Sequence, residues 1–125
     1  MAAWCRMLAC GLFATTLSGV ANAVVLTTPI VVVNNSASNT VVNCTITNLT
    51  GQAHSVDIEL IDSHGATIAK VTRDMPANGG YHYTTAPGGN AYKAVYCKFT
   101  VPDVVKSNLR AGIYTPGTGI SFPAE

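Results

Sequence analysis

The stretch that decides the fold is residues 94–101, AVYCKFTV, in which apolar and polar side chains alternate. Val95, Cys97, Phe99 and Val101 recur at every second position. Because a β-strand places successive side chains on opposite faces, this spacing predicts a strand with one buried face. Cys97 lies within that face.

The same period of two recurs along the chain from residue 24 onward, and no window of ten or more residues there has helical spacing. We predict about seven short strands, with turn signals roughly every 8–12 residues. They cover residues 24–33, 41–49, 55–60, 67–72, 81–86, 91–101 and 109–113. This pattern favours an all-β fold, a single immunoglobulin-like antiparallel β-sandwich.

The cysteines refine this prediction. Cys44 shares the inward face of the second strand with Val42 and Ile46. Cys97 likewise lies on the inward face of the sixth strand. In an immunoglobulin-like sandwich these strands lie in opposite sheets, so we expect one inter-sheet disulfide, Cys44–Cys97. The alternatives are two buried thiols or a metal pair, although neither cysteine has another Cys or a His within four residues.

The N-terminus indicates export. Arg6 is followed by an apolar run that ends at Ala21-Asn22-Ala23, a small-x-small cleavage pattern. We therefore predict a signal peptide at residues 1–23 and one domain at residues 24–125, secreted or periplasmic, where disulfides persist. No apolar segment approaches the roughly 20 residues of a membrane-spanning helix, so we expect no membrane span.

Four segments carry a resemblance: residues 44–48 (CTITN), 56–62 (VDIELID) with Gly65, 94–101 and 109–113 (LRAGI). Their layout resembles that of small exported bacterial β-sandwich proteins of unassigned function, over most of residues 24–125. The resemblance implies the fold and bacterial export. It carries no catalytic residue to this chain.

Charge and motifs narrow the function classes. Without Arg6, six Lys and Arg balance six Asp and Glu, and no basic stripe forms, so we expect no nucleic-acid partner. No catalytic motif is present, and we predict a protein that is not an enzyme and needs no cofactor. The histidines are dispersed, so we expect no metal site. A His54–His82 site with Asp57 or Asp62 is the alternative.

The candidate binding residues are aromatic and basic. Tyr92, Tyr96 and Lys98 share the outward face of the sixth strand, and Arg110 and Tyr114 share that of the seventh. If these strands are in one sheet with the third strand, they form a Tyr/Arg face, a composition enriched at binding hot spots. The alternative is that the tyrosines only stabilise the sheet by cross-strand packing.

Carboxylates lie beside this face in the predicted sheet. Asp57 and Glu59 share the outward face of the third strand. We interpret them as partners of Lys98 or Arg110 in cross-strand ion pairs rather than as a catalytic pair.

Two functions follow from these features. The first is a secreted or periplasmic non-enzymatic binding module whose partner is an unknown extracytoplasmic protein or glycan. The second is a structural subunit of a cell-surface assembly joined by strand addition, because residues 24–33, VVLTTPIVVV, could complete a neighbour's sheet.

Overall fold

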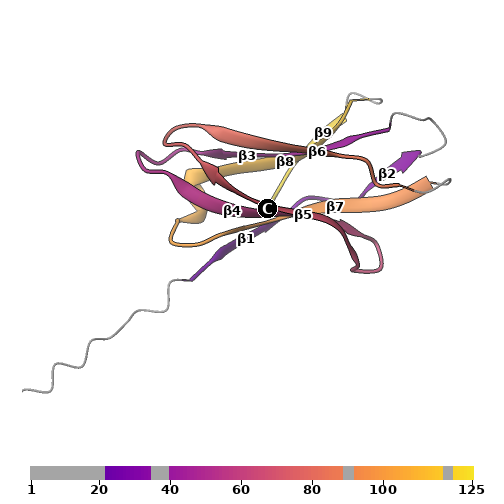
Figure 1. Ribbon diagram of the computed structural model, residues 1–125, viewed down its shortest axis with the longest axis horizontal. Coiled ribbons are helices and arrows are strands. Elements are labelled where there is room, and N and C mark those ends of the chain that lie inside the picture. The colour runs from indigo at the N-terminus through magenta and orange to yellow at the C-terminus, as the bar shows by residue number, and fades with distance from the viewer. Residues whose placement is uncertain (1–21, 35–39, 89–91, 117–119) are drawn as a thin grey trace, which may run out of the picture.

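The computed structural model describes residues 22–34, 40–88, 92–116 and 120–125, so nearly all of the predicted signal peptide lies outside the described residues. These residues form two antiparallel sheets, seen as two layers in Figure 1. The first has the order β1 (Val24–Thr27), β7 (Tyr92–Val101), β4 (His54–Asp62), β5 (Thr67–Met75), with β2 (Val31–Asn34) also paired to β7. The second has the order β6 (Gly80–Thr85), β3 (Val42–Asn48), β8 (Leu109–Thr115), β9 (Ile120–Pro123). The all-β prediction is confirmed.

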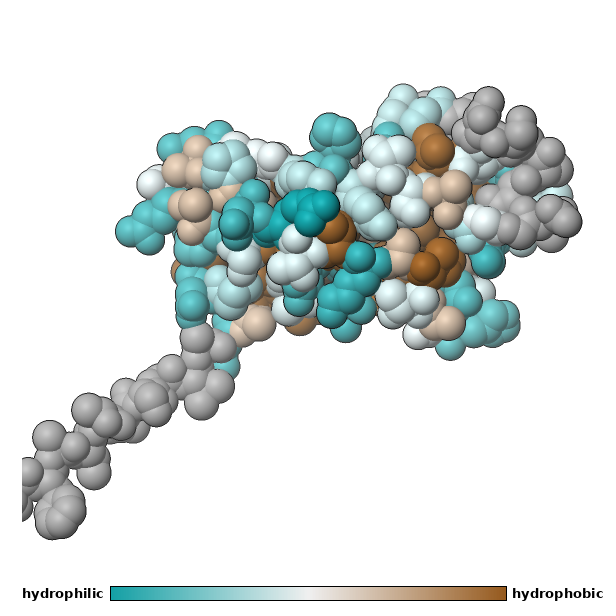
Figure 2. All heavy atoms as spheres, viewed as in Figure 1, coloured by the Kyte–Doolittle hydropathy of each residue, from teal (hydrophilic) through white to brown (hydrophobic). Residues whose placement is uncertain are grey.

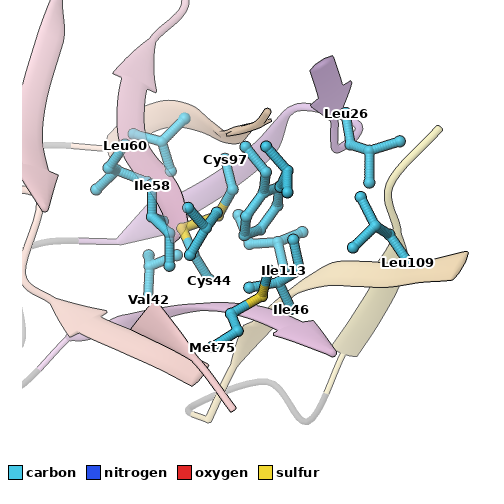
Figure 3. Close-up of a cluster of buried hydrophobic side chains, with 14 of the residues drawn as sticks. Leu26, Val42, Cys44, Ile46, Ile58, Leu60, Met75, Cys97, Leu109 and Ile113 are labelled. Atoms are coloured by element: carbon cyan, nitrogen blue, oxygen red, sulfur yellow. A yellow bond between two sulfur atoms is a disulfide. The ribbon is translucent and has the colours of Figure 1, made fainter. Parts of the chain in front are cut away.

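The inward faces of both sheets supply one hydrophobic core. Phe99 is the largest fully buried side chain, and the inward residues of β3, β4 and β7 surround it as their alternation predicted. The Sγ atoms of Cys44 on β3 and Cys97 on β7 lie 2.01 Å apart in a disulfide that joins the two sheets through this core (Figure 3).

The N-terminal strand differs from the prediction because it is broken into two pieces, both on the same edge of β7. Val24 of β1 pairs with Val101, so the numbers of paired residues add up to 125. Val31 of β2 pairs with Val95, where the sum is 126. Between the two pairings, the N-terminal segment therefore holds one residue more than β7 does. The buried Thr28 maintains the pairing at this break. Its N–H donates to Cys97 O at 3.0 Å, and its Oγ1 accepts from Cys97 N at 2.9 Å.

Pro29, which follows Thr28, explains the break. Proline has no N–H for the ladder and is found at edges and bulges, where one strand holds an extra residue. The extra residue shifts the parity, so that Leu26 of β1 and Val31 and Val33 of β2 all face the core. The pieces on both sides of Pro29 lie at one edge of the first sheet.

The second difference concerns β8. We predicted that residues 109–113 share a sheet with β4 and β7, and this is wrong: β8 pairs with β3 in the opposite sheet. The reason is that both edges of β7 are already occupied, one by β4 and the other by β1 and β2. Residues 102–108, which include the 3-10 turn η1 (Lys106–Asn108), carry the chain to the other layer.

The strand number also exceeds the prediction. The described residues contain nine strands, because the N-terminal segment divides and the Pro/Gly-rich tail adds β9. Gly112 allows β9 to approach closely, since a Cβ there would lie 2.7 Å from Phe122 O. Beyond β9, Glu125 exchanges backbone hydrogen bonds with Thr27 of β1, so the C-terminal residues connect one layer to the other.

A tight turn at Asp62–Gly65 joins β4 to β5, and its Asp, Ser and Gly are typical turn residues. Gly65 adopts a φ of 83°, and its N–H donates to Asp62 O at 3.0 Å. The Asp62 carboxylate accepts the N–H groups of Ala66 and His64, each at 2.9 Å. These bonds, that of Ala66 foremost, hold the pKa of Asp62 below its ordinary value.

A buried amide, absent from the sequence interpretation, ties two loops to the end of β3. Asn48 is fully buried, and its Nδ2 donates to Gln52 O at 2.7 Å and to Pro76 O at 3.2 Å. Its Oδ1 accepts from Thr50 N at 2.9 Å and from Thr50 Oγ1 at 2.6 Å. Both ends of the amide are therefore satisfied, as burial requires.

Candidate functional site

The structure divides the predicted Tyr/Arg face. Tyr92, Tyr96 and Lys98 lie on the outer face of β7, whereas Arg110 and Tyr114 lie on the outer face of β8 in the other sheet. The prediction that these five residues form one surface is therefore wrong. The error comes from the sheet assigned to β8, since the alternation along each strand is as expected.

On the β7 side, the aromatic residues meet exposed aliphatic residues of the N-terminal edge. Val32 pairs with Ala94, and Asn34 with Tyr92. Continuing this register by one residue places Ile30 opposite Tyr96. We call the surface made by Ile30, Val32, Tyr92, Ala94 and Tyr96 the β2–β7 patch.

Three members of the β2–β7 patch are unusually exposed for their size. Tyr92 is 73% exposed, Val32 63% and Ile30 57%. A single exposed aliphatic residue is ordinary, but adjacent ones beside an exposed aromatic ring mark a surface suited to a partner. In the view of Figure 2, exposed apolar residues occur toward the end of the molecule where β2 and β9 lie.

The patch has a packed boundary on its β4 side. A register irregularity between Leu60 and Ile61 follows the regular alternation of β4. Ile61 pairs with the outward Tyr96, yet only 5% of it is exposed. Tyr96 is itself half-buried. On its β4 side the patch therefore borders a buried aliphatic residue.

Beyond Tyr96 the same outer face becomes charged. Lys98 Nζ lies 3.8 Å from Glu59 Oε2, its cross-strand neighbour, and Lys70 Nζ lies 4.0 Å from Asp57 Oδ2. The predicted ion pair between Lys98 and the β4 carboxylates is confirmed. The alternative with Arg110 is wrong because that residue lies in the other sheet. The charged strip forms one border of the apolar patch.

On the β8 side, Arg110 and Tyr114 flank Gly112. Arg110 Nη1 donates to Ser107 O at 2.9 Å and to Leu109 O at 2.8 Å, which holds the guanidinium beside the start of β8. A depression of about 330 Å³ lies over Gly112, with Thr45, Thr47 and Ser121 among its lining residues. This depression is shallow, and its lining mixes polar residues with the apolar Phe122 and Pro123.

The histidines do not converge. His54 begins β4, His64 lies in the Asp62–Gly65 turn, and the exposed His82 lies on β6 of the other sheet. Within the described part of the chain, no three His, Cys, Asp or Glu side chains gather as a metal site would require. The three histidines are thus separate surface or edge residues in this structure.

Sequence reasoning missed the aliphatic half of the β2–β7 patch. For residues 24–33 we predicted one strand and a possible role in strand addition, without assigning the faces of that strand. The signal was nevertheless present: a bulge at Pro29 turns Val31 and Val33 inward and therefore Ile30 and Val32 outward. Lys106 likewise had no predicted role in a binding site.

Comparisons with known proteins add no relatives to this picture. Among the described residues, no helix is long and apolar enough to cross a membrane. No protein-family model, curated protein or solved structure significantly matches the chain.

Proposed function

We propose that this chain is a secreted or periplasmic, non-enzymatic binding module that recognises an extracytoplasmic protein through the β2–β7 patch. The observation that carries the proposal is the adjacency of three strongly exposed apolar or aromatic residues, Ile30, Val32 and Tyr92. A protein partner suits this surface better than a glycan, because aliphatic side chains offer no hydrogen bonds to sugar hydroxyls.

Export belongs to the same proposal. The cleavage pattern at Ala21-Asn22-Ala23 supports it, as does the Cys44–Cys97 disulfide, since such bonds persist in oxidising compartments and are rare in the cytosol. The resemblance to small exported bacterial proteins points in the same direction.

We also propose that the two layers form an immunoglobulin-like sandwich with altered terminal strands. The pairs β3–β6 and β4–β7, and the disulfide between β3 and β7, match the central strands of that architecture. The terminal strands differ, because β8 pairs with β3 whereas β1 and β2 take the edge of β7. This exchange of edges is what creates the β2–β7 patch.

Strand addition is the second candidate function. β2 is the outer strand of its sheet, and residues 24–34 contain no charged side chain that would discourage pairing with another strand. However, β1 and β2 already complete the sheet of their own chain. A partner strand would therefore add outside β2, where it would also contact the β2–β7 patch.

The test compares partner recovery by matched variants. Val32→Ser combined with Tyr92→Ser is expected to weaken partner capture from the extracytoplasmic fraction by roughly 30-fold or more, the loss expected at a hot spot. Tyr114→Ser removes a tyrosine from the other sheet and should leave capture unchanged. Both proteins should keep nearly the stability of the parent, because exposed positions contribute little.

Equal capture by the double variant and the parent would refute the proposal. Elution volume separates the two candidate functions: a binding module stays a defined monomer or dimer, whereas a subunit joined by strand addition gives an open-ended series.

A further inference from the structure

A notch opens where the two layers meet, on the side where the C-terminal residues cross from β9 to β1. Its volume is about 400 Å³, and apolar residues make up most of its lining: Leu26, Leu109, Ala111, Pro123 and Ala124. Leu26 and Leu109 face each other across the gap between the layers in Figure 3. Both are only 3% exposed, so they form the floor of the notch.

Two cations stand at the rim of this apolar notch. Lys106 of η1 and Arg110 of β8 both line it, together with Ser107. The two bonds from Arg110 Nη1 to backbone carbonyls leave the three N–H groups on Nη2 and Nε without an acceptor in the described chain. Two hydrogen bonds thus hold the Arg110 guanidinium in place, and three of its N–H groups remain available to a ligand.

The other four cations of the described residues lie away from the notch. Lys98 and Lys70 pair with carboxylates, and Arg73 donates to Tyr81 Oη at 3.1 Å. Lys93 donates to Pro87 O and lies in the field of Asp62. Like Arg73 and Lys93, Lys106 and Arg110 form no salt bridge with a described carboxylate, Glu125 included. Two cations without a carboxylate partner therefore lie together at one apolar opening.

We propose that this notch binds a single-chain amphiphile with a carboxylate head, a medium-chain fatty acid. The planar fork of Arg110 matches a carboxylate in two-point geometry, and Lys106 adds a second charge. The alkyl chain would cover Leu26, Leu109 and Pro123. The volume falls within the range of small-molecule sites, roughly 300–1,000 Å³. This site is separate from the β2–β7 patch and does not depend on its function.

The test is a titration of the purified protein with octanoate, followed by amide shifts in nitrogen–proton correlation spectra. Octanoate should bind below its micelle concentration with a Kd on the order of 1 mM, as suits a ligand of that size. The saturable shifts should centre on Leu26, Ala111 and Ala124. Octanamide and octylamine, which lack the negative charge, should bind at least about fivefold more weakly.

Variants assign the head-group contacts. Arg110→Gln is expected to raise the octanoate Kd roughly tenfold or more, and Lys106→Gln about threefold. Lys70→Gln, the matched loss of a cation on the other sheet, should leave it unchanged. Since Arg110 also bonds backbone carbonyls, its variant could disturb β8, but Lys106 has no such bond and separates the two effects.

Three results would overturn the proposal. They are the absence of saturable shifts at the notch, equal binding of octanoate and octylamine, and an unchanged Kd in both charge variants. Binding of anionic phospholipid vesicles without any binding of free octanoate would also overturn it, because the occupant would then be a membrane surface.

Discussion

Replacing both Cys44 and Cys97 with alanine is expected to lower the free energy of unfolding by about 4 kcal/mol. The reason is the length of the loop that the bond closes, since the cysteines are 53 residues apart. A cross-link across so long a loop lowers the conformational entropy of the unfolded chain and so stabilises the folded state. Urea denaturation of the parent and the double variant measures the difference. Against a typical stability of about 5–15 kcal/mol, the loss should be obvious.

Reduction of the parent protein provides the control for this experiment. Alanine also removes two buried sulfur atoms, whereas reduction keeps their volume in the core, so the reduced parent isolates the contribution of the cross-link. We expect most of the decrease in the free energy of unfolding both in the reduced parent and in the double alanine variant. A decrease below about 1 kcal/mol in the reduced parent would contradict the role given to the disulfide.

Asn48→Ala is expected to lower the free energy of unfolding by about 3 kcal/mol. The substitution leaves the carbonyls of Gln52 and Pro76 and the donors of Thr50 without their buried partner, and each unsatisfied group carries a desolvation penalty. Thermal or urea unfolding measures the loss. Asn43→Ala is the matched control. Asn43 lies on the outward face of β3, and among the described residues its side chain bonds only Thr84, so we expect a loss of less than about 1 kcal/mol there.

Asn48→Asp tests the burial of the same side chain through the pH dependence of stability. At neutral pH one oxygen of the introduced carboxylate would still accept from Thr50, but the other would replace Nδ2 and face the carbonyls of Gln52 and Pro76 without a donor. We expect burial and these two carbonyls to outweigh the Thr50 bonds and to raise the pKa of the carboxyl group above the unfolded value of about 3.9. The folded state then binds more protons than the unfolded state, and stability falls as pH rises from about 4 toward the folded pKa. A variant as stable as the parent at neutral pH would contradict the burial described for Asn48.

Much of the fold could be predicted because it depends on local alternation. Cys44 and Cys97 each lie two residues from other core residues of their own strands, and this parity alone placed both in the core. The Asp62–Gly65 turn was predictable for a similar reason, since its residues form their bonds within five positions of one another. Such features need no knowledge of which strands are neighbours.

The choice of strand partners could not be read in this way. Arg110 and Tyr114 alternate as predicted, but nothing within residues 109–115 indicates that β3 rather than β7 is their neighbour. That choice depends on β1 and β2, more than 70 residues earlier, occupying the edge of β7. The Asn48 network was hidden for the same reason, because one of its acceptors, Pro76, is 28 residues away.

The most direct test of the central claim is hydroxyl-radical footprinting of the protein alone and bound to the partner recovered from the extracytoplasmic fraction. The readout is the oxidation rate of individual side chains, and tyrosines react strongly when exposed. Our account predicts that binding protects Tyr92 and the neighbouring Val32 while Tyr114 and Phe122, both 37% exposed on the other sheet, react as before. Protection of Tyr114 and Phe122 with unchanged oxidation of Tyr92 would contradict it.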